Sequence, residues 1–488
     1  MPGLPPGFLE YIAPLPGDAL AAFVASFDEP PRSGLRVNTL KIDAPALVER
    51  LPYDVEPLAW AQAGYVLTGA GGEPGPAPGK HPYHAAGLYY LQEPSAMAPA
   101  AALAPQPGER VLDLCAAPGG KTTQIAALMR SRGLLVANEI HPQRVWELAE
   151  NLERCGVTHA AVLNETPEQV AGHFGAFFDR VLVDAPCSGE GMFRKSEAAR
   201  RDWSPTLVQS CAMRQAGILD QAANLVRPGG RLVYSTCTFN LEENEACIAA
   251  FLARRSDFEL LPAPAFPGSA AGGGSVLLEQ AGLGKGVRSS LEQALRLWPH
   301  LLPGDGHFVA VMRRSGELAN STQLELLPSG ASRRRGRQAR GPAAGVNQPF
   351  YDFCRDSLAG AFLDRLAAGQ IVVVGSYLYW IPEGLPDLGR LKVIHPGWWL
   401  GVIKTGERHS RFEPSHALAL GLQPDEALWM LDLHLNDPAL AAYLHGETLE
   451  SAGPDGWLLV QVDGYALGWG KRTQGRVKNL YPKGLRQV

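Results

Sequence analysis

Two cysteines and an aspartate follow apolar runs of the chain, at points where a side chain can do chemistry. Asp184–Cys187 (DAPC) comes after one run and Ser235–Cys237 (STC) after another. If both runs are parallel strands of one sheet, their ends meet at one edge, where such folds bind ligands. Taken alone, each cysteine is best explained as a small buried thiol. Their joint placement with Asp184 favours a reactive site.

A thiol beside a carboxyl group suits methylation of carbon 5 of cytosine. That carbon is a poor nucleophile until a thiolate adds to position 6, and the sulfur must later be expelled, which suits cysteine better than serine. The carboxyl group of Asp184 would pair with the nitrogen edge of the ring. Because DNA cytosine methyltransferases use a Pro-Cys cysteine, the residues alone leave Cys187 and Cys237 as rival nucleophiles.

A glycine-rich turn ends another predicted strand of this sheet, where Asp113–Thr122 reads DLCAAPGGKT. Glycines at a strand-to-helix turn let the backbone approach a ligand and direct helix N–H groups at a negative group. The spacing is neither GxGxxG nor that of a P-loop. Glu139 ends the next strand, where an acidic side chain accepts hydrogen bonds from ribose hydroxyls. Together they predict a site for an adenosine-containing ligand.

Short apolar strands alternate with helices from about residue 105 to 240, which predicts a parallel sheet covered on both faces. The predicted strands are Arg110–Leu114, Leu134–Asn138, Ala161–Asn164, Arg180–Asp184, Arg231–Thr236 and a late strand at Gly306–Met312. The predicted helices are Thr122–Met129, Pro142–Cys155 and Leu207–Val226.

The flanking regions differ in character. Before about residue 95, a helical opening precedes an extended segment, Leu35–Leu40, and a Pro/Gly-rich loop, Gly69–Pro82. After the sheet, a stretch without periodicity leads to a helical segment, Phe350–Leu366. Predicted strands follow at Ile371–Val374, Tyr377–Ile381, Trp398–Lys404 and Trp457–Val462. The predicted division is 1–95, 96–313, a linker at 314–348, and 349–488.

The composition and the N-terminal sequence indicate the class of the protein and its expected location. The 488 residues are 46% hydrophobic, which is ordinary for globular domains, and no apolar run approaches the ~20 residues that cross a membrane. The N-terminus lacks the pattern of a signal peptide, so we expect a cytoplasmic protein without a membrane partner, acting as a monomer. Seven cysteines without a CxxC pair predict neither a disulfide framework nor a metal site.

The net charge of −5 argues against a nucleic-acid partner only on average, because phosphates bind to local patches. Five arginines crowd 333–340, and the tail Lys471–Arg486 carries six basic residues and no acidic one. A charge run alone is more often a solvated surface. These two stretches are therefore candidate RNA contacts only.

The motifs strongly resemble those of the NOL/NOP/Sun family of RNA cytosine-5 methyltransferases. The matching stretches are RVNTLK, GLYYLQEPSAM, VLDLCAAPGGKTTQIA, DAPCSGEGMFRK, LVYSTCTFNLEENE and the ending GWGKRTQGRVKNLYPKGLR. Within the family, the bacterial RsmF-like branch, which methylates 16S rRNA of the small subunit, is the most similar. The resemblance implies a doubly wound, Rossmann-like class I methyltransferase sheet. It also implies an N-terminal RNA-binding α+β region and a C-terminal β-rich, PUA-like RNA-binding module.

The resemblance also implies roles. The Thr-Cys cysteine, here Cys237, attacks the base, and the Pro-Cys cysteine, here Cys187, helps to release the product. Asp184 would contact the cytosine edge and lie near the cofactor, S-adenosyl-L-methionine. Glu139 would hold its ribose, with Arg144 as a further contact. The cofactor loop would be Cys115, Ala116, Ala117, Pro118, Gly119, Gly120 and Lys121.

Some positions carry weaker expectations. Family members often have an aspartate after the third strand that contacts adenine, whereas this chain has Glu165 and Thr166 there, so the adenine contact is left unassigned. Arg194 and Lys195 are expected to hold RNA phosphates. The C-terminal module also contains aromatic side chains for which core packing is favoured over base stacking. These are Trp398, Trp399 and Trp469.

The expected partner is ribosomal RNA, free or in the small subunit. The same chemistry on tRNA is one alternative, and a non-catalytic RNA-binding factor of ribosome assembly is another. The presence of both Cys187 and Cys237 with an intact loop argues against the second alternative.

Overall fold

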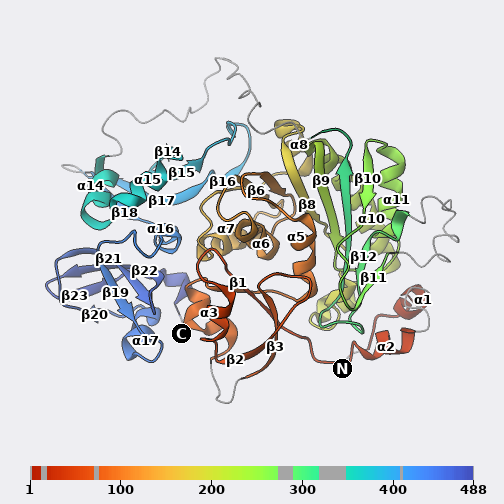
Figure 1. Ribbon diagram of the computed structural model, residues 1–488, viewed down its shortest axis with the longest axis horizontal. Helices are drawn as coiled ribbons and strands as arrows, with labels where there is room; N and C mark the ends of the chain where they lie inside the picture. The colour runs from red at the N-terminus through yellow and green to blue at the C-terminus, as the bar shows by residue number, and fades with distance from the viewer. Residues whose placement is uncertain are drawn as a thin grey trace.

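A computed structural model of the protein describes residues 3–12, 19–70, 76–272, 290–317, 348–406 and 410–486. The arginine cluster at 333–340 and most of the predicted linker lie outside these residues. In Figure 1 the chain runs from the N-terminal region at the bottom, through a large central sheet, to the C-terminal half on the left.

The central sheet has ten strands in the order β11-β12-β13-β9-β8-β5-β6-β7-β16, with β10 paired to β13. The five strands from β9 to β7 are parallel, whereas β10 to β13 and β16 are antiparallel to their neighbours. The strands are β5 (Arg110–Asp113), β6 (Leu134–Asn138), β7 (Ala160–Leu163), β8 (Phe178–Asp184), β9 (Val226–Thr236), β10 (Phe258–Leu261), β11 (Ser269–Ala271), β12 (Leu295–Leu297), β13 (His307–Arg314) and β16 (Val393–His395).

Helices cover both faces of this sheet, and two separate apolar cores lie beneath them. One face carries α5 (Ala98–Leu103), α6 (Gly120–Leu128) and α7 (Arg144–Arg154), and the other α8 (Pro167–Phe174), α10 (Pro205–Leu225) and α11 (Glu245–Arg254). On α7, Val145, Leu148 and Leu152 recur at helical spacing and are buried against the sheet. These features confirm the predicted doubly wound α/β sheet.

The order of the strands reverses beside β5. The chain enters the sheet at β5, adds β6 and β7 on one side, and then crosses to β8 and β9 on the other. The carboxyl ends of β5 and β8 therefore flank the reversal point, where doubly wound sheets bind their ligands.

The N-terminal region forms an antiparallel sheet in the order β2-β3-β1-β4. Its elements are α1 (Phe8–Ile12), α2 (Leu20–Ala25), β1 (Gly34–Val37), α3 (Ala44–Val48), β2 (Tyr53–Pro57), β3 (Gly64–Ala70), α4 (Pro82–Ala85) and β4 (Tyr89–Leu91). Buried Arg36 of β1 donates to the Gly120 carbonyl at 3.1 Å and to the Thr123 hydroxyl at 2.7 Å. This sheet is thereby held against the start of α6.

The C-terminal half contains two further sheets, β14-β15-β17-β18 and β19-β21-β22-β23-β20. Two helices, α14 (Gln348–Ser357) and α15 (Gly360–Leu366), precede the first sheet in place of the single predicted helical segment. This sheet comprises β14 (Gly369–Val374), β15 (Tyr377–Pro382), β17 (Trp398–Thr405) and β18 (Ser410–Pro414), and helix α16 (His416–Gly421) follows it. The second comprises β19 (Met430–Leu433), α17 (Pro438–His445), β20 (Leu449–Glu450), β21 (Gly456–Val462), β22 (Tyr465–Thr473) and β23 (Arg476–Asn479).

Core packing of the C-terminal tryptophans is confirmed for two of three. Trp398 and Trp469 are 4% and 3% exposed, and their indole N–H groups donate to Ala417 and Ser415 carbonyls. Trp399 is half-buried and stacks on His395.

Among the described residues, no helix has both the length and the apolar character that a membrane span requires.

Strand β16 was not predicted and links the two halves of the chain. It lies between β15 and β17 in sequence, yet it pairs with β7 as the last strand of the central sheet. A shared apolar core joins the halves a second time, because Leu35 and Tyr83 of the N-terminal region lie in one cluster with Leu458 and Val460 of β21. The C-terminal half is therefore integrated with the rest of the molecule.

Candidate active site

Cys187 and Cys237 lie side by side beyond the carboxyl ends of β8 and β9. These strands are adjacent and parallel, with Asp184 opposite Ser235, so the segments that follow leave the sheet together. The two sulfur atoms are 3.4 Å apart. The hydrogen bond with Cys237, together with burial, raises the pKa of Cys187 well above its ordinary value. Cys187 is therefore a protonated thiol at neutral pH, in hydrogen-bond contact with the sulfur of Cys237.

An ion pair lies next to the thiols. The Lys121 ammonium donates to Asp184 Oδ2 at 2.7 Å, and the Ser235 hydroxyl donates to Oδ1 at 2.8 Å. Burial opposes ionisation of Asp184, but Lys121, His307 and these hydrogen bonds hold the pKa of the carboxyl group below its usual value. The charge of Asp184 outweighs the effect of burial on Lys121 and raises its pKa. Lys121 was predicted in the cofactor loop, and its ammonium points to Asp184.

Two buried glutamates tie the segments of the two cysteines together. Glu190 accepts from the Phe239 and Asn240 backbone N–H groups at 2.7 and 3.0 Å. Glu243 accepts from the Ser188 N–H at 3.0 Å and from the Asn240 side-chain amide at 2.7 Å. Both glutamates are fully buried. The thiols therefore sit on loops that hold each other, rather than on independent loops.

Gly191 marks the closest approach of these loops. Its N–H donates to the Cys237 carbonyl at 2.9 Å, and a Cβ at this position would lie 2.9 Å from that oxygen and 2.8 Å from the Asp305 carbonyl. Real Cβ atoms do not approach carbonyl oxygens so closely. The glycine is therefore required by the geometry that joins the loops.

The predicted cofactor loop connects β5 to α6. Gly119 has a φ of +110°, and a Cβ there would lie 3.2 Å from Leu148 of α7. At the start of the loop, the Thr122 hydroxyl donates to Asp113 at 2.7 Å. Burial, supported by the nearby charge of Asp184, raises the pKa of Asp113 to about 7. Burial likewise raises the pKa of Cys115.

Glu139 at the end of β6 has unused acceptor capacity. It is 5% exposed and accepts from the backbone N–H groups of His141 at 2.8 Å and Ala117 at 3.3 Å. A carboxylate offers about four lone-pair sites, so two remain for a ligand. Arg144 lies 4.0 Å from this carboxylate and donates to the Ala117 carbonyl at 2.7 Å. The residues present fit a ribose diol beside the loop.

The two residues at the unassigned adenine position have structural partners. The Thr166 hydroxyl caps α8 by accepting from the Gln169 N–H at 3.3 Å. Glu165 Oε1 accepts from the Lys392 N–H at 2.6 Å, near β16. A residue from the C-terminal half therefore lies beside this part of the site.

His307 joins the site, although sequence reasoning did not single it out. Strand β13 is antiparallel to β9 with Val309 opposite Ser235, which is itself opposite Asp184, so His307, two residues from Val309, lies on the same face of the sheet as these residues. Directly opposed residues share a face of the sheet. Burial, with the charge of Lys121, lowers the pKa of His307 to about 3, so the ring is neutral. Only knowledge of this antiparallel pairing would have revealed it.

A hydrogen-bond chain reaches the ring of His307. The Ser95 hydroxyl lies 3.1 Å from Nδ1 of His307 and 2.5 Å from a carboxylate oxygen of Glu93. The Glu93 side chain also accepts the backbone N–H groups of Ser95, Ala96 and Asp305, and burial raises the pKa of its carboxyl group. Ser95 and Glu93 therefore hold the imidazole ring from its Nδ1 side.

Arg194 does not hold RNA phosphates as expected, because its side chain is 3% exposed and forms an ion pair with Asp305 at 2.7 Å. Lys195 pairs with the other oxygen of Asp305 at 2.5 Å but remains partly exposed. In the C-terminal tail, Arg472 is buried and donates to the Pro454 carbonyl. The other tail cations are exposed or half-buried.

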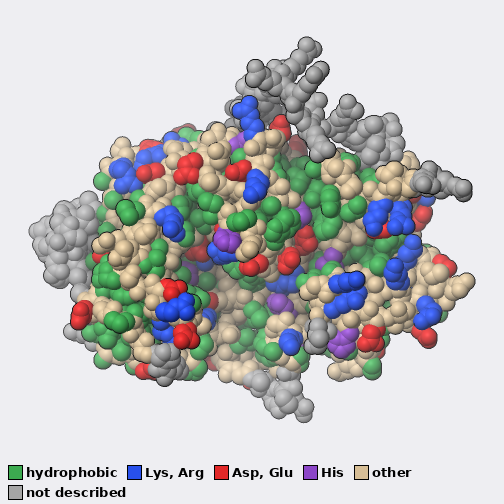
Figure 2. All heavy atoms as spheres, turned by 180° about the vertical axis from the view of Figure 1, so that it is seen from behind, with side chains coloured by type: hydrophobic (Ala, Val, Ile, Leu, Met, Phe, Trp, Pro, Cys, Tyr) green, Lys and Arg blue, Asp and Glu red, His purple; other side chains and the backbone are tan. Residues whose placement is uncertain are grey.

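Exposed tail cations lie on the hairpin β22–β23, where Lys471 and Lys478 oppose each other directly. Like charges in this arrangement destabilise a hairpin unless an anion binds there. Figure 2 shows Lys and Arg side chains gathered over the C-terminal half on the rear face. This hairpin is a candidate phosphate-binding surface.

Comparison with known proteins assigns the chain to a family. Family models match along its length: "N-terminal domain of 16S rRNA methyltransferase RsmF" at residues 4–94, "16S rRNA methyltransferase RsmB/F" at 100–313, "RsmF rRNA methyltransferase first C-terminal domain" at 352–422 and "Methyltransferase RsmF PUA domain" at 431–487.

Relatives named ribosomal RNA small subunit methyltransferase F match almost end to end. Those from Vibrio atlanticus and Aeromonas hydrophila are each 33% identical, over 99% of this chain and 97% of theirs. The crystal structure of a methyltransferase homolog protein from Pyrococcus horikoshii is 32% identical, with a TM-score of 0.54 over 63% of this chain and 94% of that one.

NSun6 from Pyrococcus horikoshii, solved with SFG, shares the fold at 21% identity and a TM-score of 0.54, over 64% of this chain and 99% of that one. Together with the doubly wound sheet and the C-terminal PUA match, the near-complete coverage by curated relatives leaves one conclusion. The chain belongs to the RsmB/F family of 16S rRNA methyltransferases.

Proposed function

We propose that the protein methylates carbon 5 of cytosine in small-subunit rRNA, using S-adenosyl-L-methionine, through a covalent bond between Cys237 and the base. One observation carries this proposal: two thiols 3.4 Å apart lie beside a partly buried Lys121–Asp184 ion pair at the reversal point of the sheet. Attack on the base requires only one thiol. A second thiol is useful because the covalent bond must later be broken to release the product.

In the first step, Cys237 Sγ forms a bond to carbon 6 of the cytosine. The neighbouring ammonium of Lys121 and the thiol of Cys187 both stabilise the thiolate that attacks, one by its charge and the other by a hydrogen bond. Asp184, ionised and held by Ser235, accepts the amino group at the nitrogen edge of the ring. The electron pair of the 5,6 double bond thereby becomes available at carbon 5.

The bound cofactor supplies an electrophilic methyl group, which carbon 5 takes as the methyl–sulfur bond breaks. The role of the chain is to hold the two reactants together. Glu139 offers its two unused lone pairs to the ribose, and Arg144 lies beside it. The backbone from Cys115 to Gly120 faces the rest of the ligand, with Gly119 and Gly120 backed by α7 and the N-terminal region.

Release reverses the addition. A base removes the proton from carbon 5, the 5,6 double bond reforms, and the carbon 6–sulfur bond breaks to leave a thiolate on Cys237. The Cys187 thiol is placed to hydrogen-bond to that departing sulfur, because its raised pKa keeps it protonated. This accounts for the expected role of Cys187 in product release.

The two thiols act on opposite sides of the covalent intermediate, which gives a sharp test. Cys237→Ala removes the attacking sulfur, so methyl transfer should be abolished with no protein–RNA adduct. Cys187→Ala leaves the attack intact but slows expulsion, so a covalent complex should accumulate with 16S rRNA. Denaturing gel electrophoresis before and after ribonuclease treatment reveals the complex.

The double variant Cys187→Ala/Cys237→Ala is the matched control and should form no adduct. A trapped complex in Cys237→Ala with inactive Cys187→Ala would assign the nucleophile to Cys187. Methylated RNA from the wild type without an adduct in any variant would exclude the covalent route. Bisulfite sequencing of the product RNA, with tRNA as a second substrate, identifies the base and the RNA class.

A further inference from the structure

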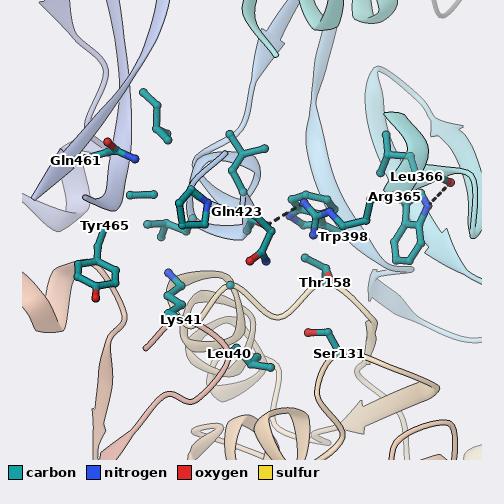
Figure 3. Close-up of a pocket in the computed structure, with 18 of the residues that line it drawn as sticks. Leu40, Lys41, Ser131, Thr158, Arg365, Leu366, Trp398, Gln423, Gln461 and Tyr465 are labelled. Atoms are coloured by element: carbon teal, nitrogen blue, oxygen red, sulfur yellow. Dashed lines mark hydrogen bonds between the residues drawn. The ribbon is translucent and has the colours of Figure 1, made fainter. Parts of the chain in front are cut away.

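A cavity of about 340 Å³ lies where the N-terminal region, the central sheet and the C-terminal half meet (Figure 3). Ser131 before β6 and Thr158 before β7 form its floor, so it lies at the amino edge of the parallel strands, opposite the catalytic edge. Lys41 enters from the N-terminal region, Gln423 from the end of α16 and Gln461 from β21.

The elements that line the cavity are in direct contact with one another next to it. A Cβ at Gly156 would lie 2.6 Å from the Leu420 carbonyl, and one at Gly421 would lie 2.6 Å from the Trp398 ring. Only glycine permits these approaches. The cavity is therefore enclosed by elements that pack closely against one another.

Its lining carries a net positive charge. Lys41, Arg130 and Arg365 line the cavity, and no Asp or Glu is among its described lining residues. Because Arg365 pairs with Glu426 at 2.8 Å, the charge available to a ligand is that of Lys41 and Arg130. The Lys41 ammonium donates to the Ala86 and Arg154 carbonyls at 2.7 and 3.1 Å, which leaves one N–H. Burial lowers the pKa of Lys41 to about 7, so a bound anion would favour its charged form.

Two amides provide the other polar contacts. Gln461 is 4% exposed, its amide projects into the cavity in Figure 3, and within the described residues this amide has no hydrogen-bond partner. The amide is therefore available to hydrogen-bond with a ligand in the cavity. Gln423 reaches towards the centre from above. Each amide is both donor and acceptor, as are the edges of nucleobases.

We propose that this cavity is a binding site for one nucleotide, with its phosphate at Lys41 and its base edge at Gln461 and Gln423. The indole of Trp398 in the wall offers an apolar surface to the base. Ligand sites usually span roughly 300–1,000 Å³, so a cavity of this size holds about one nucleotide. The nucleotide is either free or an unstacked unit of RNA, and only the second source rests on the proposed function.

The first arm of the test uses cytidine 5′-monophosphate and calorimetry. The enzyme is saturated with S-adenosylhomocysteine so that the predicted cofactor site is filled. The nearly isosteric Gln461→Leu should weaken binding about tenfold or more, as a lost hydrogen bond to a charged or buried group predicts. Lys41→Met should do the same, whereas Lys404→Met, which removes an exposed charge from β17, should not. Cytidine and inorganic phosphate should each bind more weakly than the nucleotide.

The second arm measures the dissociation constant of a 16S rRNA fragment and the methyl-transfer rate at saturating RNA. If the nucleotide belongs to RNA, Gln461→Leu weakens RNA binding while the saturated rate is unchanged. If it is free, only the nucleotide arm responds. Equal affinities of wild type and Gln461→Leu for both probes would overturn the proposal. An inactive enzyme that still binds the nucleotide through Gln461 would refute the proposed function and leave this inference standing.

Discussion

At the scale of single residues, Glu139 combines burial with unused lone pairs, and this makes its role testable apart from RNA binding. Glu139→Ala should raise the dissociation constant of S-adenosylmethionine about tenfold or more, because a hydrogen bond to a charged group contributes about 1.5–3 kcal/mol. Calorimetry measures this value. RNA affinity should stay within twofold of the wild type, and a parallel loss of both would indicate misfolding instead.

The carboxyl group of Asp113 should make stability depend on pH. Its pKa is raised to about 7 in the folded chain by burial, against 3.8 for a free carboxyl group. Between these values the folded chain holds a proton that the unfolded chain has released, so stability falls as pH rises and then stays level above about pH 7. Thermal unfolding of the cofactor-free enzyme should follow this trend.

Asp113→Asn keeps an acceptor for the Thr122 hydroxyl and removes the titration. This variant should melt close to the wild type near pH 4 and above it at pH 8. A constant difference between the two proteins across that range would contradict the assignment.

At the scale of elements, the active site depends on two loops that brace each other through Glu190, Glu243 and Gly191. Gly191→Ala would place a Cβ within 2.9 Å of two carbonyl oxygens, so one loop must shift. Misplacement of a thiol by a fraction of an ångström lowers catalysis steeply. Methyl transfer should fall at least tenfold, while the cofactor dissociation constant, measured by calorimetry, stays the same.

Gly217 provides the matched control for this substitution. It lies within α10, and a Cβ there meets nothing within 4 Å. Gly217→Ala should leave activity unchanged and stabilise the helix slightly, since alanine is the better helix former. Similar losses in both variants would mean that the brace between the loops is unimportant.

At the scale of the whole molecule, the C-terminal half is tied to the catalytic sheet. Residues 349–488 were predicted as a separate RNA-binding module, and this division remains a prediction. Removal of residues 349–488 would destabilise the rest of the chain, because two sets of contacts would be lost. These are the pairing of β16 with β7 and the apolar core that Leu35 and Tyr83 share with Val460. The cut would expose a strand edge and a contiguous apolar surface.

A chain that ends at residue 348 should therefore melt several degrees lower than the full protein and bind an apolar dye. A chain that ends at residue 424 retains β16 and should recover part of the loss, which differential scanning calorimetry can resolve. If the shorter chain melts like the full protein, the integration of the two halves contributes nothing to stability.

The amino-acid sequence by itself determined the parallel core and the positions of its reactive residues. Strands β5, β6 and β8 were predicted to within about two residues, because strands buried on both faces read as apolar runs. The motifs with Cys187, Cys237 and Glu139 follow directly from the ends of such runs. Their approach to one edge needs only the rule that parallel strands end together.

Only the tertiary structure decided which groups touch. Local sequence patterns do not specify the directions of side chains. The structure was therefore needed to show the 3.4 Å contact between the sulfur atoms, the hydrogen bond from Lys121 to Asp184 and the burial of Arg194. His307 reaches the site through an antiparallel return strand, and β16 arrives from about 230 residues further along the chain than β7. Such pairings are set by the packing of distant segments, because the local hydrophobic period specifies that a strand forms but not which strand it will meet.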